Sequence, residues 1–301
     1  MGKEEMVRTF DEIVNRAKEI GPKRAAILFP HDADVLHAVM DGMREGLIAP
    51  VLVGDTERII STAQQSGIPI GTMEMIQRVD PQEAADLCLD MMLNNEVSFA
   101  VKGNILTTYL YRSLIRVTKH LAPDQAPCTI CFHYLPAIKK IFAITDPGVS
   151  ITPDLASKEK ILANTIQVFR SLGYASPCVM VLAVRRFREE SSQALEEARL
   201  LQQGAAAGKF GPCEFLPHTD LLELAKGGGL HPETFPDIFL VPHINAGNIL
   251  VKTIDHIMAG IRQCVTVGGG MIVLTPSRSD GYEVRIKNLA LGLALASAGR
   301  R

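Results

Sequence analysis

The chain passes from strand to helix in the stretch Asp237-Ile238-Phe239-Leu240-Val241-Pro242-His243-Ile244-Asn245-Ala246-Gly247-Asn248-Ile249-Leu250-Val251-Lys252. Residues 237–241 suit a buried strand in length and in β-branched or aromatic content, and apolar residues recur at helical spacing over 249–259. A strand, polar turn and helix in this order place backbone N–H groups and side-chain amides at the edge of an open sheet. Anions bind α/β proteins at that edge. On this stretch alone, an ordinary strand-to-helix connection is an equally good interpretation.

A second turn of the same kind, Thr275-Pro276-Ser277-Arg278-Ser279-Asp280, follows the apolar run at 271–274. The planar guanidinium of Arg278 matches the oxygens of phosphate and carboxylate groups and stays charged at any working pH. The hydroxyls of Ser277 and Ser279 and the carboxylate of Asp280 lie beside it in sequence. The turn therefore predicts an oxyanion site, with a surface arginine capped by Asp280 as the alternative.

The rest of the chain alternates short apolar strands with amphipathic helices, which is typical of an α/β fold with a largely parallel sheet. The predicted strands include 24–29, 51–53 and 98–101, and the predicted helices include 4–20, 33–47, 55–65 and 80–94. Two consecutive strands, 128–134 and 140–145, have no helix between them, which predicts an antiparallel pair and a change of domain. The last helix, 283–298, is apolar on more than one side, so we expect it to be buried.

Composition excludes several classes of function. The 301 residues are 47% hydrophobic and carry a formal net charge of −2, with 5% aromatic residues and no Trp. These values disfavour recognition of nucleic acid, which needs basic surface and stacking rings. No apolar run approaches the ~20 residues of a membrane span, and the charged start does not suit a secretory signal. We therefore predict a cytoplasmic protein with no nucleic-acid or membrane partner.

Motifs for metals, redox chemistry and nucleotides are missing. No GxGxxG follows a strand, no GxxxxGK[ST] or GxSxG is present, and no two of the eight His residues have metal-ligand spacing. Cys128 and Cys131 lie within a predicted strand, where residues three apart face opposite sides. We interpret these cysteines as buried small residues, and His31 and His243 as structural or solvent-facing.

Polar residues at two further strand ends join the candidate site. Lys102-Gly103 follows a predicted strand and precedes Thr107, so it offers a cation and a hydroxyl, with a solvated loop lysine as the alternative. Asp146 ends another strand, where carboxylates often cap turns.

In this order, the motifs resemble those of the phosphate acetyl/butyryltransferase family, and more closely its butyryl branch. Residues 242–252 are similar to the family's Pro-x-Ile-x-Ala-Gly-Asn-Ile-x-x-Lys, and 277–280 to the butyryl branch's Ser-Arg-Ala-Asp. Lys102-Gly103 with Thr107 matches Lys-Gly-x-x-x-Thr, and Thr145-Asp146 with Pro153-Asp154 and Lys158 matches the family's Thr-Asp, Pro-Asp and Lys segment. The resemblance spans roughly residues 24 to 298.

The resemblance implies two α/β domains flanking a cleft, as in isocitrate and isopropylmalate dehydrogenases. The first domain would contain residues 1–137 and 281–301, closed by the C-terminal helix, and the second would contain residues 138–280. The implied reaction converts a short-chain acyl-CoA, with butyryl-CoA favoured, and phosphate into acyl phosphate and free coenzyme A, or the reverse. Coenzyme A is then a substrate, and neither a permanently bound cofactor nor a metal is expected. A homodimer or larger even homo-oligomer is also implied.

The resemblance also suggests roles for individual residues. Asp280 would be the base for the coenzyme thiol or its orienting group, with Glu283 in reserve, while Arg278 and Ser277 would stabilise phosphate and the developing oxyanion. The remaining predicted substrate-binding and phosphate-binding residues are Lys102, Gly103, Thr107, Asp146, Asn248 and Lys252.

Two alternatives stay open. A non-catalytic relative that binds acyl phosphate or coenzyme A is favoured by departures from the family pattern at Leu216, His243 and Asn245. A hydroxy-acid dehydrogenase of the same fold is the other, and it requires a metal site and a nicotinamide site that the sequence does not show.

Overall fold

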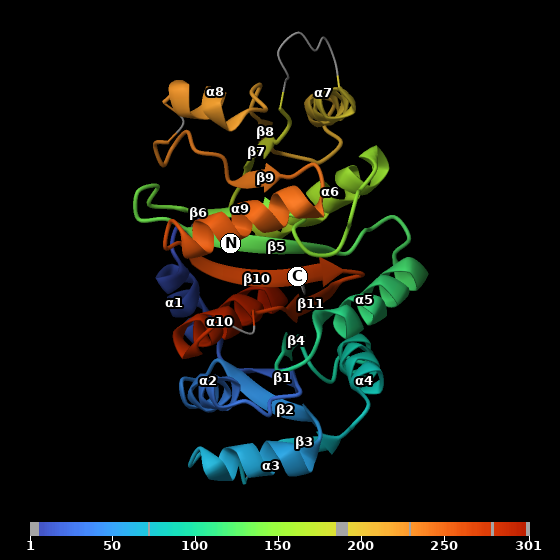
Figure 1. Cartoon of the computed structure of the whole chain (residues 1–301), viewed down its shortest axis with the longest axis vertical. Coiled ribbons are helices and arrows are strands. Elements are labelled where there is room, and N and C mark those ends of the chain that lie inside the picture. Colours follow the sequence, from blue (N-terminus) through green and yellow to red (C-terminus); the bar gives the residue numbers. More distant parts are fainter. Residues whose placement is uncertain (1–5, 72, 185–191, 229, 278–279, 299–301) are drawn as a thin grey trace. The chain divides into compact units, whose positions relative to one another are not determined.

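The computed structural model describes residues 6–71, 73–184, 192–228, 230–277 and 280–298, and it divides the chain into two compact units (Figure 1). Unit 1 contains residues 1–9 and 124–262, and unit 2 contains residues 10–123 and 263–301. Both units combine strands with packed helices, so the predicted mixed α/β class is confirmed.

The boundaries of these units differ from those expected at 137/138 and 280/281. The strand β5 (Cys128–Tyr134) pairs with β6 (Ile141–Thr145), so both strands of the predicted antiparallel pair belong to unit 1. The strand β11 (Met271–Leu274) pairs with β4 (Phe99–Lys102), which places β11 and the turn after it in unit 2.

Unit 2 has the strand order β3-β2-β1-β4-β11-β10, parallel except for the antiparallel pair β10–β11. Besides β4 and β11, its strands are β1 (Lys23–Leu28), β2 (Ile48–Gly54), β3 (Glu74–Gln77) and β10 (Ile261–Gly268, of which unit 2 includes Gln263 onward). Its helices are α1 (Phe10–Ile20), α2 (Ala33–Arg44), α3 (Thr56–Gln65), α4 (Pro81–Leu93), α5 (Thr107–Leu121) and α10 (Tyr282–Ala298).

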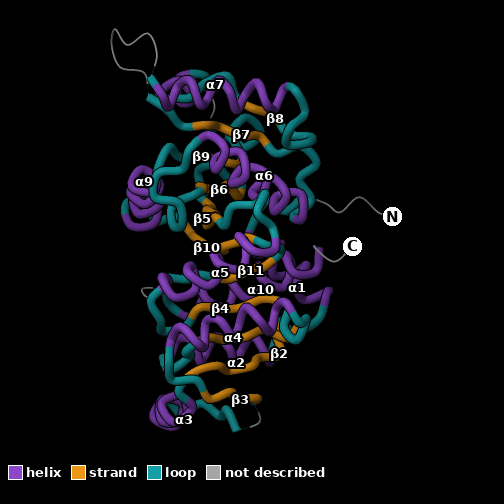
Figure 2. The backbone as a smooth tube through the Cα atoms, turned by 90° about the vertical axis from the view of Figure 1, so that its right-hand side faces the viewer, coloured by secondary structure: helices purple, strands orange, loops and turns teal. Residues whose placement is uncertain are grey.

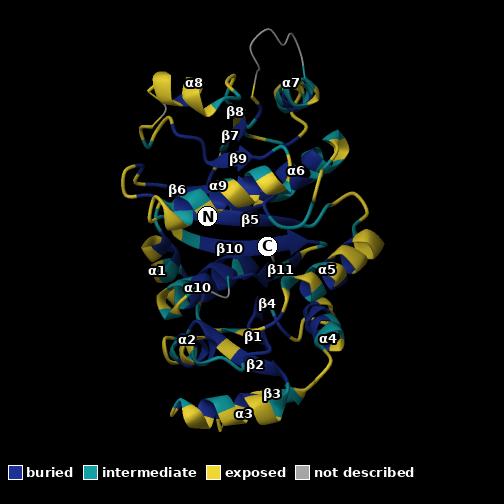
Figure 3. Cartoon of the chain, viewed as in Figure 1, coloured by how far each residue is buried: buried dark blue, intermediate teal, exposed yellow. Residues whose placement is uncertain are grey.

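The helices of unit 2 cover both faces of its strands. The helices α4 and α5 enclose a hydrophobic core against β1, β2, β4 and β11, and α10 packs against α1, α2, β4 and β11 (Figure 2). Burial of α10 from Leu289 to Ala296 on successive positions explains its apolar sequence, as expected. Figure 3 shows the strands as mostly buried and the outer helix faces as exposed.

Unit 1 has the strand order β5-β6-β9-β7-β8, with an antiparallel pair at β5–β6 and parallel pairs elsewhere. Its remaining strands are β7 (Cys178–Val181), β8 (Glu214–Phe215) and β9 (Ile238–Leu240). Its helices are α6 (Leu155–Ser171), α7 (Gln193–Ala206), α8 (Leu221–Lys226) and α9 (Ile244–His256). The helices α6 and α9 lie on opposite faces of the strands in Figure 2.

Four elements differ from the sequence prediction. The helix α1 begins at Phe10 because residues 7 and 8 form backbone hydrogen bonds in unit 1, from Val7 N to Leu172 O and from Ile141 N to Arg8 O. The strands β3 and β10 were not predicted. The helix α9 begins at Ile244 rather than 249, so Asn248 lies within a helix and not in a turn.

Candidate functional site

The carboxyl ends of β1, β4 and β11 meet at one edge of unit 2, because these three strands are parallel neighbours. The chain runs from β1 outward through β2 to β3, then returns to β4 on the other side of β1. Such a reversal of strand order opens the crevice in which α/β proteins bind ligands. Lys102 ends β4, and Ser277 follows β11, so two of the predicted motifs lie at this edge.

Lys102 is 3% exposed, and its Nζ lies 3.4 Å from the carbonyl oxygens of both Gly103 and Pro276. The alternative of a solvated loop lysine is therefore wrong. The structure instead brings the buried ammonium group against the loop that begins after β11.

Gly103 is required by the close approach of its backbone to β1. Its N–H donates to Leu28 O at 2.8 Å, and a Cβ at this position would lie 2.5 Å from the carbonyl oxygens of Leu28 and Phe29. No side chain fits between two such backbone segments. The glycine thus allows β4 to end beside β1 with Lys102 at the edge.

Ser277 and Asp280 are joined by two hydrogen bonds. The Ser277 N–H donates to Oδ2 of Asp280 at 2.7 Å, and the Asp280 N–H donates to Ser277 O at 3.2 Å. Both residues are partly exposed, whereas Glu283 is exposed on α10. Arg278 lies outside the described residues.

Arg285 was not singled out in the sequence, although it contacts this same loop. Its side chain extends from the first turn of α10, is 8% exposed, and donates from Nε to Asp280 O at 2.8 Å and from Nη2 to Ser277 O at 3.2 Å. In the sequence it is one charged residue at the start of a helix, so only the tertiary contacts reveal it.

His31 follows β1 at the same edge of unit 2 and packs edge-on against Phe29. Its Nδ1 is buried without a hydrogen-bond partner among the described residues. Burial and then the charge of Arg58 lower the pKa of His31, against the opposite effects of Asp55 and Asp32. A neutral imidazole with one unused nitrogen is therefore a further polar group at this edge.

Thr107 is the first residue of α5, which leaves the same edge. Leu106, at the N-cap of α5, provides no side-chain hydrogen bond, and the first turn contains no acidic residue. The N–H groups of this turn therefore have no side-chain cap and carry the positive end of the helix dipole.

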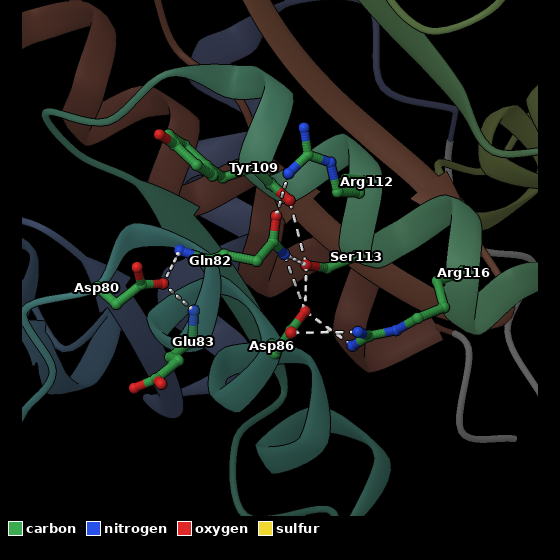
Figure 4. A network of polar contacts seen from close by, with 8 residues as sticks. All are labelled: Asp80, Gln82, Glu83, Asp86, Tyr109, Arg112, Ser113 and Arg116. Carbon is green, nitrogen blue, oxygen red and sulfur yellow. Dashed lines mark hydrogen bonds and ion pairs between the residues drawn. The ribbon is translucent and has the colours of Figure 1, made fainter.

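A polar network holds α5 against α4 (Figure 4). The buried hydroxyl of Ser113 accepts from Nε2 of Gln82 at 2.7 Å and lies within hydrogen-bond distance of Asp86, which in turn pairs with Arg116 at 2.7 Å. Arg112 donates to Oε1 of Gln82 at 3.3 Å. These contacts fix the position of α5 within unit 2, and with it the position of Thr107.

Asp146 belongs to unit 1, where it follows β6 and is 2% exposed. Its Oδ1 accepts from the N–H groups of Thr129, Gly148 and Val149, and its Oδ2 accepts from Ser150 N, at 2.8–3.1 Å. Burial raises the pKa of Asp146, while these four donors act in the opposite direction. The geometry favours a role in shaping the 147–150 loop over direct contact with a phosphate.

The first turn of α9 packs against the loop after Asp146. Ile244 N donates to Ile151 O at 3.1 Å, and a Cβ on Gly247 would lie 3.0 Å from Cα of Pro147. His243 is the N-cap of α9, and its Nδ1 accepts from Ala246 N at 3.3 Å, which confirms the structural interpretation of this histidine. Histidine is not a preferred N-cap residue, which explains why the helix start was missed.

Asn248 and Lys252 lie four residues apart on α9, and both side chains are exposed. Residues four apart share a helix face. Unit 1 therefore contains the Asp146 loop and α9, which carries the amide of Asn248 and the ammonium group of Lys252. Unit 2 contains the other described site residues, which are Lys102, Gly103, Thr107, Ser277 and Asp280.

A separate hollow in unit 1, with a cavity volume of about 890 Å³, lies between α7 and α8 and the segment before α8. Its lining is largely polar and includes Glu196, Arg199, His218, Glu223 and Lys226. None of the predicted site residues lines it.

Lys158, which the motif comparison included, forms a buried ion pair with Glu197 of α7. Cys128 and Cys131 are buried on β5, as interpreted from the sequence, and burial raises the pKa of the Cys128 thiol. Among the described residues, no three His, Cys, Asp or Glu side chains are grouped so as to hold a metal ion. None of the described helices combines the length and hydropathy needed to span a membrane.

Comparison with known proteins places the fold among phosphotransacylases. A branched-chain phosphotransacylase from Enterococcus faecalis has a TM-score of 0.74 at 18% identity and covers 91% of this chain and 99% of its own. A phosphotransacetylase from Streptococcus pyogenes has a TM-score of 0.75 at 13% identity, with coverage of 96% and 99%.

Sequence comparison gives the more particular relationship. The phosphate butyryltransferase of Clostridium acetobutylicum is 24% identical over 298 residues, covering 97% of this chain and 99% of its own. The phosphate acetyltransferase of Thermotoga maritima is 25% identical over 293 residues, covering 95% and 99%. No family model matches the chain. The resemblance to the phosphate acetyl/butyryltransferase family is confirmed over nearly the full chain.

Proposed function

We propose that the chain is a phosphate acyltransferase that interconverts a short-chain acyl-CoA and phosphate with acyl phosphate and coenzyme A. The observation that carries the proposal is the buried ammonium group of Lys102 against the loop after β11. The uncapped first turn of α5 adds N–H donors close in sequence to Lys102. Relatives of this activity span nearly the whole chain.

In the direction of acyl-CoA synthesis, the coenzyme sulfur forms a bond with the acyl carbon while the bond from that carbon to a phosphate oxygen breaks. Free phosphate leaves, and the thiol proton, with a pKa near ~8.5 by analogy with cysteine, passes to a base. Asp280 is the proposed base or orienting group, because its carboxylate is held by the Ser277 N–H. Glu283, exposed one turn away on α10, stays in reserve.

The remaining predicted residues have supporting roles in this proposal. Arg278 and Ser277 stabilise the phosphate and the oxyanion that develops at the acyl carbon, and Lys102 and Thr107 bind phosphate. Asn248 and Lys252 are proposed to bind anionic groups of the substrates, since both side chains are exposed on one face of α9. Asp146 shapes its loop through four backbone N–H groups. The predicted cleft, the oligomeric state and the coenzyme site stay predictions.

A butyryl-sized acyl group is the favoured substrate, because residues 277–280 resemble the butyryl branch. The test is release of free thiol from acetyl-, propionyl-, butyryl- and branched acyl-CoA in the presence of phosphate. Fastest turnover of butyryl-CoA supports both the acyl-transfer activity and the assigned chain length. Fastest turnover of acetyl-CoA supports the activity but overturns the chain length. No release from any of the four would favour the non-catalytic relative.

Replacement of Arg278 tests the assignment within the active enzyme. Arg278→Ala is expected to lower kcat/KM at least about a hundredfold, the usual effect of removing an oxyanion donor. Circular dichroism and the unfolding midpoint serve as controls for the fold. Near-normal turnover by a folded Arg278→Ala variant contradicts the assignment.

A further inference from the structure

Arg285 contacts two residues of the turn after β11, Ser277 and Asp280. Its Nε donates to Asp280 O at 2.8 Å and its Nη2 to Ser277 O at 3.2 Å. One guanidinium group thus binds two carbonyl oxygens that are three residues apart in the chain. The Ser277 N–H also donates to the Asp280 carboxylate. Each of the two proposed site residues is therefore held at its main chain, and Asp280 is also held through its side chain.

The charge of Arg285 is balanced differently from that of two other buried cations, Lys140 and Lys158. Lys140 pairs with Asp237 at 2.6 Å, and Lys158 pairs with Glu197. Arg285 is 8% exposed and forms no ion pair with a carboxylate among the described residues. A buried cation without a counter-ion costs free energy, so its presence beside Ser277 and Asp280 requires an explanation beyond packing.

A lysine would not reproduce this arrangement. Arginine presents its donors in a fixed planar fork, whereas lysine has one nitrogen on a flexible stem. The two acceptors are met by different nitrogens of the fork, Nε and Nη2. The geometry therefore depends on the guanidinium group and not on positive charge alone.

We propose that Arg285 is a positioning residue that holds Ser277 and Asp280 in their working geometry and adds positive potential beside them. This inference rests on the proposed acyl transfer, in which Ser277 and Asp280 take part. Arg285 acts through these two residues and is not assigned a contact with substrate. An anionic substrate group bound beside them would then compensate the buried charge.

The test compares Arg285→Lys and Arg285→Gln with Lys287→Gln as the matched control. Lys287 lies on the same helix but pairs with Asp11 at 2.9 Å, away from the turn. Arg285→Gln is expected to lower kcat about 10- to 100-fold, the range for loss of hydrogen bonds to a charged group. Arg285→Lys is expected to fall between Arg285→Gln and the wild type, and Lys287→Gln is expected to match the wild type.

Two readouts separate positioning from a purely structural role. If Arg285 positions Asp280, the pH profile of kcat shifts in Arg285→Lys, while the KM for acyl-CoA changes by less than kcat. An unchanged pH profile and unchanged kcat in a folded Arg285→Lys variant would overturn the proposal, as would an equal loss in Lys287→Gln.

Amide hydrogen exchange keeps the inference testable without activity. Ser277 N and Asp280 N are both hydrogen-bonded within the turn, so their exchange is expected to accelerate in Arg285→Lys and to stay slow in Lys287→Gln. If the wild type transfers no acyl group, the proposed function fails, but this measurement still decides whether Arg285 holds the turn. Equal exchange in all three proteins overturns it even where Arg285→Gln does not fold.

Discussion

Two loops at strand ends, one in each unit, are held by side chains of opposite charge. In unit 2, the buried guanidinium of Arg285 binds the carbonyl oxygens of Ser277 and Asp280. In unit 1, the buried carboxylate of Asp146 binds N–H groups of the loop that follows it, from Gly148 to Ser150. The first loop is thus held through its acceptors and the second through its donors.

The difference shows where an anion is better accommodated. A cation that holds a loop leaves positive charge at the site, and Lys102 lies against Pro276 O of the same segment. A carboxylate that holds a loop consumes the N–H groups that an anion would use and repels the anion itself. The proposed function therefore assigns the phosphate to the edge of unit 2, while Asp146 shapes a loop within unit 1.

The largest expected effect concerns the glycine that allows β4 to end beside β1. In Gly103→Ala the new Cβ would lie 2.5 Å from two backbone carbonyl oxygens, whereas in Gly247→Ala it would meet the Val241 side chain at 2.9 Å and Pro147 at 3.0 Å. The nearest atoms to Gly103 are all backbone atoms, whereas those nearest to Gly247 include side-chain atoms, which move more easily. We expect Gly103→Ala to lower the free energy of unfolding by about 3 kcal/mol and Gly247→Ala by about 1–2 kcal/mol.

Urea unfolding of both variants measures these values, with Gly281→Ala as the control. Gly281 precedes α10, and a Cβ added there would have no other atom within 4 Å. Its replacement is expected to be neutral. Equal losses of unfolding free energy in Gly103→Ala and Gly247→Ala would show that the end of β4 in unit 2 and the start of α9 in unit 1 are packed equally tightly. The two units would then not differ in packing at these strand ends.

An intermediate effect is expected from Asp146→Asn. The amide keeps one oxygen acceptor but directs an NH₂ group toward Ser150 N, so at least one partly buried N–H loses its partner. We expect a loss of about 2 kcal/mol in the free energy of unfolding, the usual range for a buried unsatisfied donor. Asp154→Asn is the matched control, because Asp154 is an exposed cap of α6 that accepts a hydrogen bond from Ser157 N. A loss no larger than that of the control contradicts the structural role of Asp146.

The smallest effect concerns pH. The hydroxyl of Tyr282, at the start of α10, donates to Oδ2 of Asp41 at 2.8 Å, which raises the pKa of Tyr282 to about 12. The unfolded value is 10.0. Because the folded value is the higher one, this contribution to stability is complete below pH 10 and is lost as the pH rises through about 12. This hydrogen bond joins the start of α10 to α2.

Ultraviolet titration of the tyrosines measures this pKa. Tyr282→Phe is expected to remove the titration near 12, and Asp41→Asn is expected to return it toward 10. A wild-type titration curve that Asp41→Asn leaves unchanged would mean that the hydrogen bond does not persist in solution.

Much of the fold was predictable because most strands are continuous apolar runs and most helices have clear caps. Asp32, Asp55, Asp80 and Asp154 each cap the helix that follows, as expected for this residue type. The missed strand β10 carries polar residues such as Arg262 and Gln263, so it has no continuous apolar run. It forms an antiparallel hairpin with β11.

The candidate site was predictable in its residue types but not in its grouping. Lys102 and Pro276 are 174 residues apart, and only the pairing of β4 with β11 brings them together. Arg285 could not be found from the sequence, because a charged residue in the first turn of a helix has many ordinary explanations. Asp146 was predicted as a binding residue, and its four backbone donors favour a role in shaping its loop.

The discontinuity of unit 2 has a consequence for synthesis on the ribosome. Residues 10–123 emerge before the whole of residues 124–262, and β11, the turn after it and α10 emerge last. Until then β4 lacks its neighbour β11, and Lys102 lacks the segment against which it lies. Nascent chains that stop before residue 263 can complete the strands of β5 to β9, but they cannot assemble the edge that binds phosphate in the proposed function. If the proposed function holds, chains that stop before residue 263 are expected to be inactive.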